Sequence, residues 1–494
     1  MTCTVAVSQV DVRWQAGATL NASDGALAPY YIGSMRGGTV TQQHSTLLHA
    51  GLCHEMDTTS RLSWGAGVEL WGGWASSANY AGTRITAAHN EHPARLWVQQ
   101  AWLEGKHRGV RLTLGAKHAG SPLLSDDLTS GDLVRSGNSR PMVGVNGGFV
   151  NFQTVPFTRG WLQVAGEVGY YKPGDNKWLE NHFNYYNHFL TTGWWMNYKN
   201  LYFRSHPDKP LVVTIGMQAA CQFGGKRTPY VAGVAGETID QKADAEAFFK
   251  ALIPGSGGAN VGDQVFYEGN HLGSWDLLLD YRLRSGAHLR AYRQSPWEDG
   301  SGIGFRNGFD GLWGLEWRAA QPGWLTAALI EYIDMTNQGG PIHWAPTDHK
   351  GTTVTTKVTG MDNYYNNFAY NGYHNRGMSI GSPMLRSPLY NRDGHLHYDH
   401  NVVRGVHAAV KGQFSPQVHY RVMGSWRRSW GSMEQPLPSV DATSLMVEAT
   451  YSPSRVPGLE CLAQLALDRG KLYGNNVGAL LSVTYHGNFT LGKK

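Results

Sequence analysis

VTIGMQAACQF, at residues 213–223, alternates between two kinds of side chain along its whole length. The first kind is apolar and comprises Val213, Ile215, Met217, Ala219, Cys221 and Phe223. The second kind is small or polar and comprises Thr214, Gly216, Gln218, Ala220 and Gln222. Because successive side chains of a β-strand point to opposite faces, the stretch predicts a strand with one apolar and one polar face.

The same alternation recurs along the chain, for example at residues 275–284, 313–318, 418–427, 459–468 and 477–486. Segments of about ten residues are long enough to cross a bilayer as tilted β-strands. Counting such segments from Val10 to Tyr485 gives about eighteen strands, an even number, as single-chain outer-membrane barrels have.

The connections between these segments alternate between short and long. Short turns lie at residues 57–60, 105–109, 206–209, 285–286, 321–323, 415–416 and 452–458. Long connections lie at 22–44, 119–141, 172–187, 225–269, 295–310 and 335–400, of which the last is the longest. We therefore predict an all-β fold, one transmembrane antiparallel up-and-down barrel over residues 1–494, with strands from about 10 to 487, short periplasmic turns and long extracellular loops.

The composition agrees with a membrane barrel. Charged residues make up 16% of the chain, against about 25% in soluble domains, while it holds 62 Gly, 18 Trp and 24 Tyr. No apolar run is long enough for a transmembrane helix. A large soluble β-sandwich or a propeller is the alternative, but the chain shows neither a domain boundary nor a blade-length repeat.

Charge and targeting signals limit the compartment and the partners. The net charge is +5 and the Lys and Arg residues are scattered, so the chain has no nucleic-acid footprint. The first residues, MTCTVAVSQVDVRW, lack the cationic and apolar regions of a signal peptide, so export to a Gram-negative outer membrane requires a processed or longer start. Cys221 and Cys461 lie on apolar faces, which indicates small hydrophobic side chains rather than a disulfide.

The stretch of residues 360–394 concentrates Tyr, Asn, Arg and His side chains outside the alternating segments. Aromatic rings suit the apolar face of a sugar, and amides suit its hydroxyl groups. Together with Trp344 of the same long connection and Trp297 of the preceding one, it supplies our candidates for polysaccharide contact: Trp297, Trp344, Tyr364, Tyr365, Asn366, Asn367, Tyr370, Tyr373, His374 and Arg376. The alternative is that these aromatic residues pack together and close the barrel mouth.

Three further features leave alternatives open or indicate no special chemistry. Residues 243–253 predict a helix in a long loop, which either plugs the mouth or lies on the surface. His395, His397 and Asp399 would share one strand face, a weak candidate metal site, and we predict neither a metal nor a cofactor. Glu298 and Asp299 are the one tempting pair of carboxylates for glycoside hydrolysis, but adjacent loop residues point apart, so we predict no enzyme.

Charged residues on the polar face of neighbouring segments have opposite signs. They are Asp276, Asp280, Arg282, Arg284, Glu316 and Arg318. We expect them to form a network of ion pairs across strands that fills the interior of the barrel rather than a selective pore.

Several motifs, in order along nearly the whole chain, resemble the Wzi-like capsule assembly proteins of the Gram-negative outer membrane. They are RLSWGAG (61–67), SGDLVRSGNSRPM (130–142), GWL (160–162), CQFGG (221–225), EGNHLGSW (268–275), DNYYNN with YNGYHNRGMSIGSPML (362–385) and LDRGKLYGNN (467–476). The resemblance implies a barrel of about eighteen strands that helps retain capsular polysaccharide at the cell surface. It also implies a lectin-like rather than a catalytic role.

The leading hypothesis is therefore a monomeric barrel, surrounded by outer-membrane lipid, that binds a capsular or other surface polysaccharide without covalent chemistry. Stacking and hydrogen bonds would provide recognition, and Arg376 could pair with a uronic acid. The alternative hypothesis is a porin-like diffusion channel for small solutes.

Overall fold

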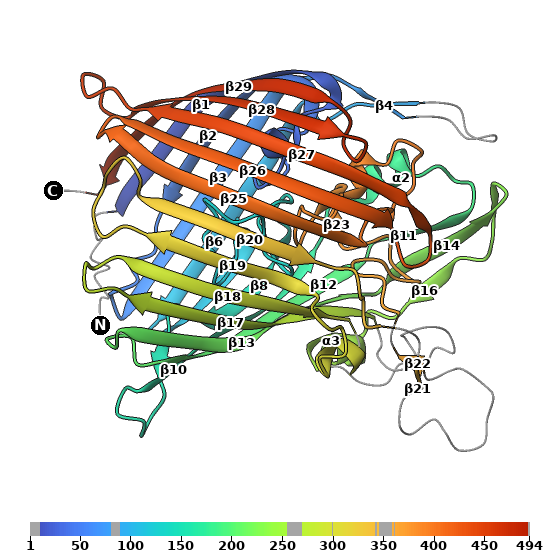
Figure 1. Cartoon of the computed structure of the whole chain (residues 1–494), viewed down its shortest axis with the longest axis horizontal. Coiled ribbons are helices and arrows are strands. Elements are labelled where there is room, and N and C mark those ends of the chain that lie inside the picture. Colours follow the sequence, from blue (N-terminus) through green and yellow to red (C-terminus); the bar gives the residue numbers. More distant parts are fainter. Residues whose placement is uncertain are drawn as a thin grey trace, which may run out of the picture.

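The computed structural model of the chain describes residues 10–80, 89–253, 269–298, 300–340, 343–344, 358–359 and 361–492. Within these residues, eighteen antiparallel strands form one closed barrel (Figure 1), as the sequence predicts. The first nine are β1 (Val10–Leu27), β2 (Gln42–His54), β3 (Leu62–Ala75), β6 (Leu96–His107), β7 (Val110–Ala116), β8 (Val143–Phe149), β10 (Leu162–Lys172), β12 (Trp195–Ser205) and β13 (Leu211–Phe223). The others are β17 (Asn270–Arg282), β18 (His288–Trp297), β19 (Gly311–Arg318), β20 (Ala327–Asp334), β25 (Val403–Ser415), β26 (Val418–Gly431), β27 (Pro436–Tyr451), β28 (Leu459–Gly470) and β29 (Asn476–Leu491).

Neighbours in sequence are neighbours in the barrel, and the first and last strands close it. β1 pairs with β29 from Val10 opposite Leu491 to Ser23 opposite Gly478. Both ends of the barrel chain thus lie at the same rim, which also carries the short turns, and we call it the short-turn end. The opposite rim is the long-loop end.

Side chains alternate between membrane and lumen as the sequence pattern requires. On β2, Leu48 is 63% exposed on the outer face, whereas its neighbours Leu47 and His49 are 2% and 9% exposed. The predicted lumen ion pairs are present in part: Glu316 pairs with Arg290 at 2.9 Å and with Arg318, and Asp280 pairs with His288 at 2.7 Å. Asp276 instead accepts hydrogen bonds from Tyr202 and Gln218.

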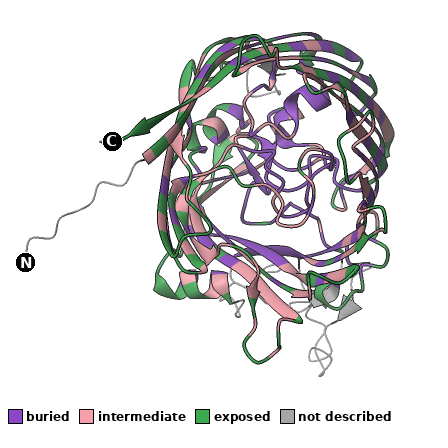
Figure 2. Ribbon diagram, turned by 90° about the vertical axis from the view of Figure 1, so that its left-hand side faces the viewer, coloured by how far each residue is buried: buried purple, intermediate pink, exposed green. Residues whose placement is uncertain are grey.

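The lumen is crossed by polypeptide rather than empty, as Figure 2 shows from the short-turn end. The main contributor is residues 117–142, the lumen loop between β7 and β8, whose Leu128 and Val134 are fully buried. Asp127 at its tip pairs with Lys411 and with Arg318, the last residue of β19, so the loop reaches the short-turn half of the barrel. The short helix α1 (Tyr30–Gly33) is also fully buried.

The predicted loop helix is α3 (Ala245–Leu252), and it does not plug the mouth. Phe248 packs against Tyr170, Trp195 and Phe223, which belong to the outer faces of β10, β12 and β13. Lys199 of β12 donates to the Ala251 carbonyl oxygen at 2.7 Å. The helix therefore lies on the outside of the barrel wall near its long-loop end, and the lumen loop fills the interior instead.

Smaller elements lie in the connections at the long-loop end. The helices are α2 (Asn176–His182), α4 (Gly300–Ile303) and the 3-10 helix η2 (Pro388–Tyr390). The short strands are β4 (Ala78–Tyr80), β5 (His89–Glu91), β11 (His188–Thr192), β14 (Gly225–Val231), β15 (Val234–Ala235), β16 (Ile239–Gln241), β21 (His343–Trp344), β22 (Val358–Thr359), β23 (His374–Asn375) and β24 (Met378–Ser379), while β9 (Gln153–Thr154) extends the sheet beside β10 at the short-turn end. Among the described residues, no helix is both long enough and apolar enough to cross a membrane.

Candidate functional site

The mouth of the barrel is closed by residues 361–402, the mouth segment, which rests on the lumen loop. The Tyr365 hydroxyl donates to the Leu133 carbonyl oxygen at 2.5 Å, and the Tyr373 hydroxyl donates to that of Val134 at 2.9 Å. In return, the Ser136 hydroxyl of the lumen loop donates to the Gly381 carbonyl oxygen of the mouth segment at 2.7 Å. The two segments therefore satisfy each other's buried polar groups, as burial requires.

Asparagine amides tie the mouth segment to other parts of the long-loop end. Asn371 donates to the Phe189 carbonyl oxygen of β11 at 2.7 Å. Asn367 donates to the Asn270 side chain of β17 at 3.2 Å, whereas Asn366 bonds within the mouth segment, to the Tyr398 carbonyl oxygen at 3.0 Å. The Tyr and Asn side chains of the segment thus form a packed, hydrogen-bonded layer.

Most of the predicted contact residues belong to this layer and are buried. These are Tyr364, Tyr365, Asn366, Asn367, Tyr370, Tyr373 and His374, together with Trp297, which ends β18. The side chain of Trp344, in β21, lies outside the described residues. In this conformation the buried rings present no face to a ligand, and their packing matches the mouth-closing alternative; contact with polysaccharide stays a prediction.

Arg376 differs from the others because it is partly exposed. It occupies the turn of the β23–β24 hairpin with Gly377, and both have positive φ, 52° and 78°. Two-residue hairpin turns with positive φ at both positions match the twist of the strands, and glycine at the second position is favoured. The turn holds the Arg376 guanidinium at the long-loop end, where it donates to the Gly174 carbonyl oxygen.

A second arginine that the sequence analysis did not single out lies beside it. Asn375 donates to the Arg140 carbonyl oxygen at 2.8 Å, which brings the end of the lumen loop against the hairpin. The Arg140 guanidinium lies over the Trp97 ring, 4.9 Å from its centroid. Burial and the charge of Arg376 lower the pKa of Arg140 to about 9.

The Arg140 guanidinium pairs with no carboxylate of the described residues within 4.0 Å. Within the part of the chain that the structure describes, the acid that acts on Arg376 is Asp175, the N-cap of α2, which is buried. Burial raises the pKa of Asp175 to about 7, so its negative charge is only partly available at neutral pH. The pair is therefore a local excess of positive charge, which an anion would stabilise.

One aromatic ring borders the pair. Trp178 of α2 stacks on His182, with ring centroids 4.4 Å apart, and its other neighbours are the His374 ring and Gly377. Trp178 is partly exposed. The long-loop end thus combines two arginines with the rings of Trp97 and Trp178, and no local sequence signal marked Arg140 or Trp178 for this role.

The histidines of the weak metal candidate are engaged in other bonds. Residues 395–399 form no strand, so the predicted alternation on one strand face is wrong. His395 bonds Asp399 at 2.7 Å, while His397 bonds the Tyr370 carbonyl oxygen at 3.2 Å. The Asp399 carboxylate raises the pKa of His395 against the effect of burial, and burial lowers that of His397. Within the described residues no group of three or more His, Cys, Asp or Glu side chains has metal-binding geometry.

The carboxylate of Glu298 accepts a hydrogen bond from the Tyr365 backbone N–H at 2.7 Å, so it serves the mouth layer. Asp299, the other member of the tempting carboxylate pair, lies outside the described residues.

Carboxylates also fix the lumen loop to the wall. Asp132, fully buried, accepts from Gln294 of β18 at 2.7 Å and from Gln218 of β13 at 2.9 Å. Glu331 of β20 accepts from the Thr129 hydroxyl at 2.6 Å and the Ser130 backbone N–H at 2.7 Å. These charge-assisted hydrogen bonds close the centre of the lumen.

Comparison with known proteins shows what the architecture resembles. No family model and no curated protein sequence matches the chain. Among solved structures it is similar to Wzi, an Escherichia coli outer membrane protein involved in group 1 capsule assembly and described as a carbohydrate binding β-barrel. The likeness covers 96% of this chain and 84% of that chain at 14% identity, with a TM-score of 0.55. At this identity the likeness shows the fold, an outer-membrane barrel of the kind predicted.

Two further structures align over most of their length. Acinetobacter baumannii OccAB4 aligns at 11% identity over 98% of this chain and 99% of that chain, with a TM-score of 0.47. Pseudomonas aeruginosa OccK1 aligns at 10% identity over 98% of this chain and 100% of that chain, with a TM-score of 0.48.

Proposed function

We propose that the protein is a monomeric outer-membrane barrel that binds a surface polysaccharide non-covalently at its long-loop end and assists capsule assembly or retention. In this orientation the long-loop end is extracellular and the short-turn end is periplasmic. The observation that carries the proposal is the uncompensated pair Arg140 and Arg376, held rigidly beside aromatic rings on a mouth closed by packed loops.

The chemistry of the pair favours acidic sugar units. A guanidinium binds a carboxylate with two parallel hydrogen bonds, and the partly exposed Trp178 supplies an apolar ring nearby. The similar fold of Wzi, which is described as carbohydrate binding, supports the same class of ligand. The buried tyrosines would then act by fixing the surface, and Tyr364, Tyr365 and their neighbours could contact sugar only after the mouth segment rearranges.

Binding of two polysaccharides to the folded barrel tests this site. We expect the protein to bind polygalacturonate more tightly than neutral dextran, and Arg140→Ala or Arg376→Ala to weaken polygalacturonate binding about tenfold, since a hydrogen bond to a charged group contributes about 1.5–3 kcal/mol. Arg159→Ala, at an exposed arginine of the short-turn end, is the matched control and should bind normally. Unchanged affinity in both test variants would remove the assigned site.

The role in capsule retention needs a cellular measurement. In a capsulated host that depends on this protein, cells with Arg376→Ala should release a larger share of polysaccharide into the medium than cells with Arg159→Ala. Equal release by both strains would contradict the retention role.

A diffusion channel for small solutes is the second candidate. It is favoured by cavities that remain along one side of the lumen, one of them of about 620 Å³. Single-channel recording in a planar bilayer separates the two, because a barrel closed by the lumen loop should show no stable conductance, whereas a diffusion channel should.

A further inference from the structure

The cavity of about 620 Å³ lies inside the barrel beneath five adjacent strands, β29, β1, β2, β3 and β6. Strand pairing aligns their inward side chains in two rows. The row nearer the short-turn end is Asn488, Arg13, Cys53, Gly67 and Trp102, and the row above it is His486, Gln15, Gly51, Glu69 and Gln100. All ten residues line the cavity, and Arg13 lies three positions from the beginning of β1, so the cavity opens at the short-turn end.

Two glycines create the space. A Cβ atom at Gly51 would make only ordinary contacts, 3.4 Å from Gln15 and from the Val68 carbonyl oxygen, so the missing side chain leaves room in the cavity. A Cβ atom at Gly67 would stand 2.7 Å from the Trp102 ring, so this glycine lets the ring lie flat against the wall. The opposite face of the ring lies below the Lys117 ammonium group, at 3.9 Å.

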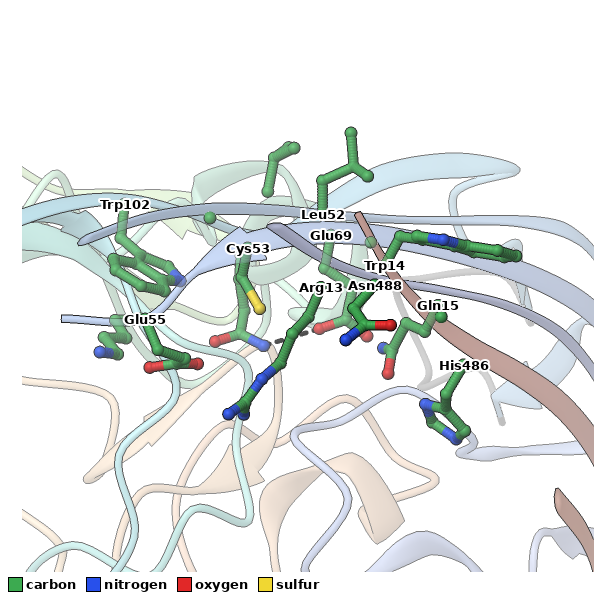
Figure 3. A pocket seen from close by; sticks show the side chains of 16 residues that line it. Arg13, Trp14, Gln15, Leu52, Cys53, Glu55, Glu69, Trp102, His486 and Asn488 are labelled. Carbon is green, nitrogen blue, oxygen red and sulfur yellow. Dashed lines mark hydrogen bonds between the residues drawn. The ribbon is translucent and has the colours of Figure 1, made fainter. Parts of the chain in front are cut away.

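Three polar side chains of the two rows are available to a ligand. The side chains of Arg13, Gln15 and Asn488 make no hydrogen bond with any described residue. Figure 3 shows Arg13, Gln15, Cys53 and His486 directed into the cavity, whereas Trp14 and Leu52 point away from it. Glu69 is held in place by Gln100 and by the Trp71 indole N–H, both at 2.6 Å.

A row of aromatic rings follows directly above. His49 stacks on Trp71, with centroids 4.6 Å apart, and Trp71 faces Trp97 at 6.2 Å, both pairs at 17°. His49 and Trp71 line a second cavity of about 340 Å³ that shares Gln15, Glu69 and Gln100 with the first. Toward the long-loop end, the Gln99 amide donates to the Gly37 carbonyl oxygen at 2.9 Å, and both residues line this second cavity.

We propose that this cavity is a binding site for a neutral oligosaccharide that enters from the short-turn, periplasmic side. The volume lies in the range of about 300–1,000 Å³ that is typical of ligand pockets. Amide, imidazole and carboxylate groups match sugar hydroxyls, and Trp102 places an aromatic ring in the lining of the cavity. The lining holds two acidic residues, Glu55 and Glu69, and two basic residues, Arg13 and Lys117, so its charges balance and do not demand a charged ligand.

Cys53 provides a direct reporter, because its free thiol points into the cavity. In a protein with the other three cysteines replaced by Ser, the rate of reaction of Cys53 with a sulfonated methanethiosulfonate reports access to the cavity. We expect maltotriose to slow this reaction at least tenfold at saturation and tri-galacturonate to slow it much less. Absence of protection by maltotriose, or stronger protection by tri-galacturonate, would overturn the proposal.

Calorimetry on filled and unfilled cavities gives the second measurement. Gly51→Trp should abolish the heat of maltotriose binding, whereas Leu52→Trp, at the adjacent outward residue, should bind normally; a heat-modifiable electrophoretic shift verifies that both barrels are folded. Equal binding by both variants would exclude this cavity.

This inference does not depend on the extracellular surface. Arg376→Ala should leave protection of Cys53 unchanged while it weakens polygalacturonate binding. Loss of Cys53 protection in Arg376→Ala would show that the sugar enters from outside, against the proposal.

Discussion

Asp132 is the side chain whose loss should most directly open the lumen. It belongs to the lumen loop, yet its carboxylate accepts hydrogen bonds from Gln218 and Gln294 of the barrel wall, at 2.9 and 2.7 Å. It also accepts from the Val134 and Arg135 backbone N–H groups, at 2.8 and 3.0 Å, and so shapes the loop itself. Asp132→Ala removes all of these bonds without adding bulk.

The magnitude follows from the two bonds to the wall. A hydrogen bond to a charged group contributes about 1.5–3 kcal/mol, so losing both weakens the docking of the loop by about 3 kcal/mol at the lower end of that range. A change of 3 kcal/mol raises the population of detached loop roughly 150-fold. The Arg135 to Glu167 and Thr129 to Glu331 contacts remain, so we expect transient opening rather than an empty barrel.

Planar-bilayer recording measures this opening. The unaltered protein should be silent, and Asp132→Ala should show frequent brief conductance steps. Asp126→Ala is the matched control because it removes the same charge from an exposed position of the same loop, where the carboxylate bonds just the nearby Ser121 N–H among the described residues. If Asp132→Ala is as silent as Asp126→Ala although folded, the lumen loop is not held by this carboxylate and the reasoning fails.

Three further outcomes test other parts of the structure. Gly377→Ala introduces a Cβ atom that would overlap the Trp178 ring, at a residue with φ of 78°. The substitution should lower the local stability of the hairpin by about 1–2 kcal/mol and weaken polygalacturonate binding several-fold. Gly474→Ala, at a residue with φ of 82° and open space around it, should bind normally. Burial raises the pKa of Asp175 to about 7, so ionisation of Asp175 destabilises the folded loop as pH rises from about 4 to 7, by up to about 4 kcal/mol at and above pH 7. Asp175→Asn should therefore make proteolysis of α2 less dependent on pH between 5 and 8. An unchanged pH profile would contradict this assignment. Phe248→Ala should weaken the packing of α3 on the wall by about 3 kcal/mol and expose the helix to protease. Phe249→Ala, at a side chain that is 61% exposed, should leave the helix protected. Equal cleavage of the two variants would show that the ring contacts do not hold the helix.

The barrel was predictable because each strand carries its own signal. Alternation of apolar and polar residues is a local property, and residues 213–223 show it as clearly in sequence as in the structure, where Ile215 faces outward and Gln218 is buried in the lumen. The alternation of short turns with long connections then fixed which rim carries the loops. Two short connections at the long-loop end, at 432–435 and 471–475, were not anticipated because the flanking strands are longer than the minimum needed to span a membrane.

The path of the loops was not predictable in the same way, because it depends on partners far away in sequence. Asp132 and Gln294 are separated by 162 positions, and nothing around Asp132 marks it as buried. Residues 243–253 show a helix but not its location, because an apolar face fits the outer wall as well as a mouth. The contact of Phe248 with Phe223 on the outer face of β13 shows that the helix lies outside the barrel.

The candidate site shows the same limit. The composition of residues 360–394 predicted an ordered segment rather than a flexible linker. Aromatic rings and amides, however, suit a packed layer as well as a sugar-binding surface. The hydrogen bonds of Tyr365 and Tyr373 to the lumen loop show that these side chains are packed. Arg376 was identified because of its charge. Arg140 was not, because its nearness to Arg376 is created by one hydrogen bond from Asn375 across 235 positions.

The seam between β1 and β29 has a consequence for biogenesis. Lumen-loop residues bond strands made much later, since Asp127 and Lys411 are 284 positions apart and the seam strand β29 comes later still. A chain that paired β1 with β29 before the lumen loop had entered would enclose an empty barrel, and the loop would then have to pass the mouth segment. Entry of the lumen loop while the wall is still an open sheet would avoid that passage, and the pairing of β1 with β29 would then enclose the loop.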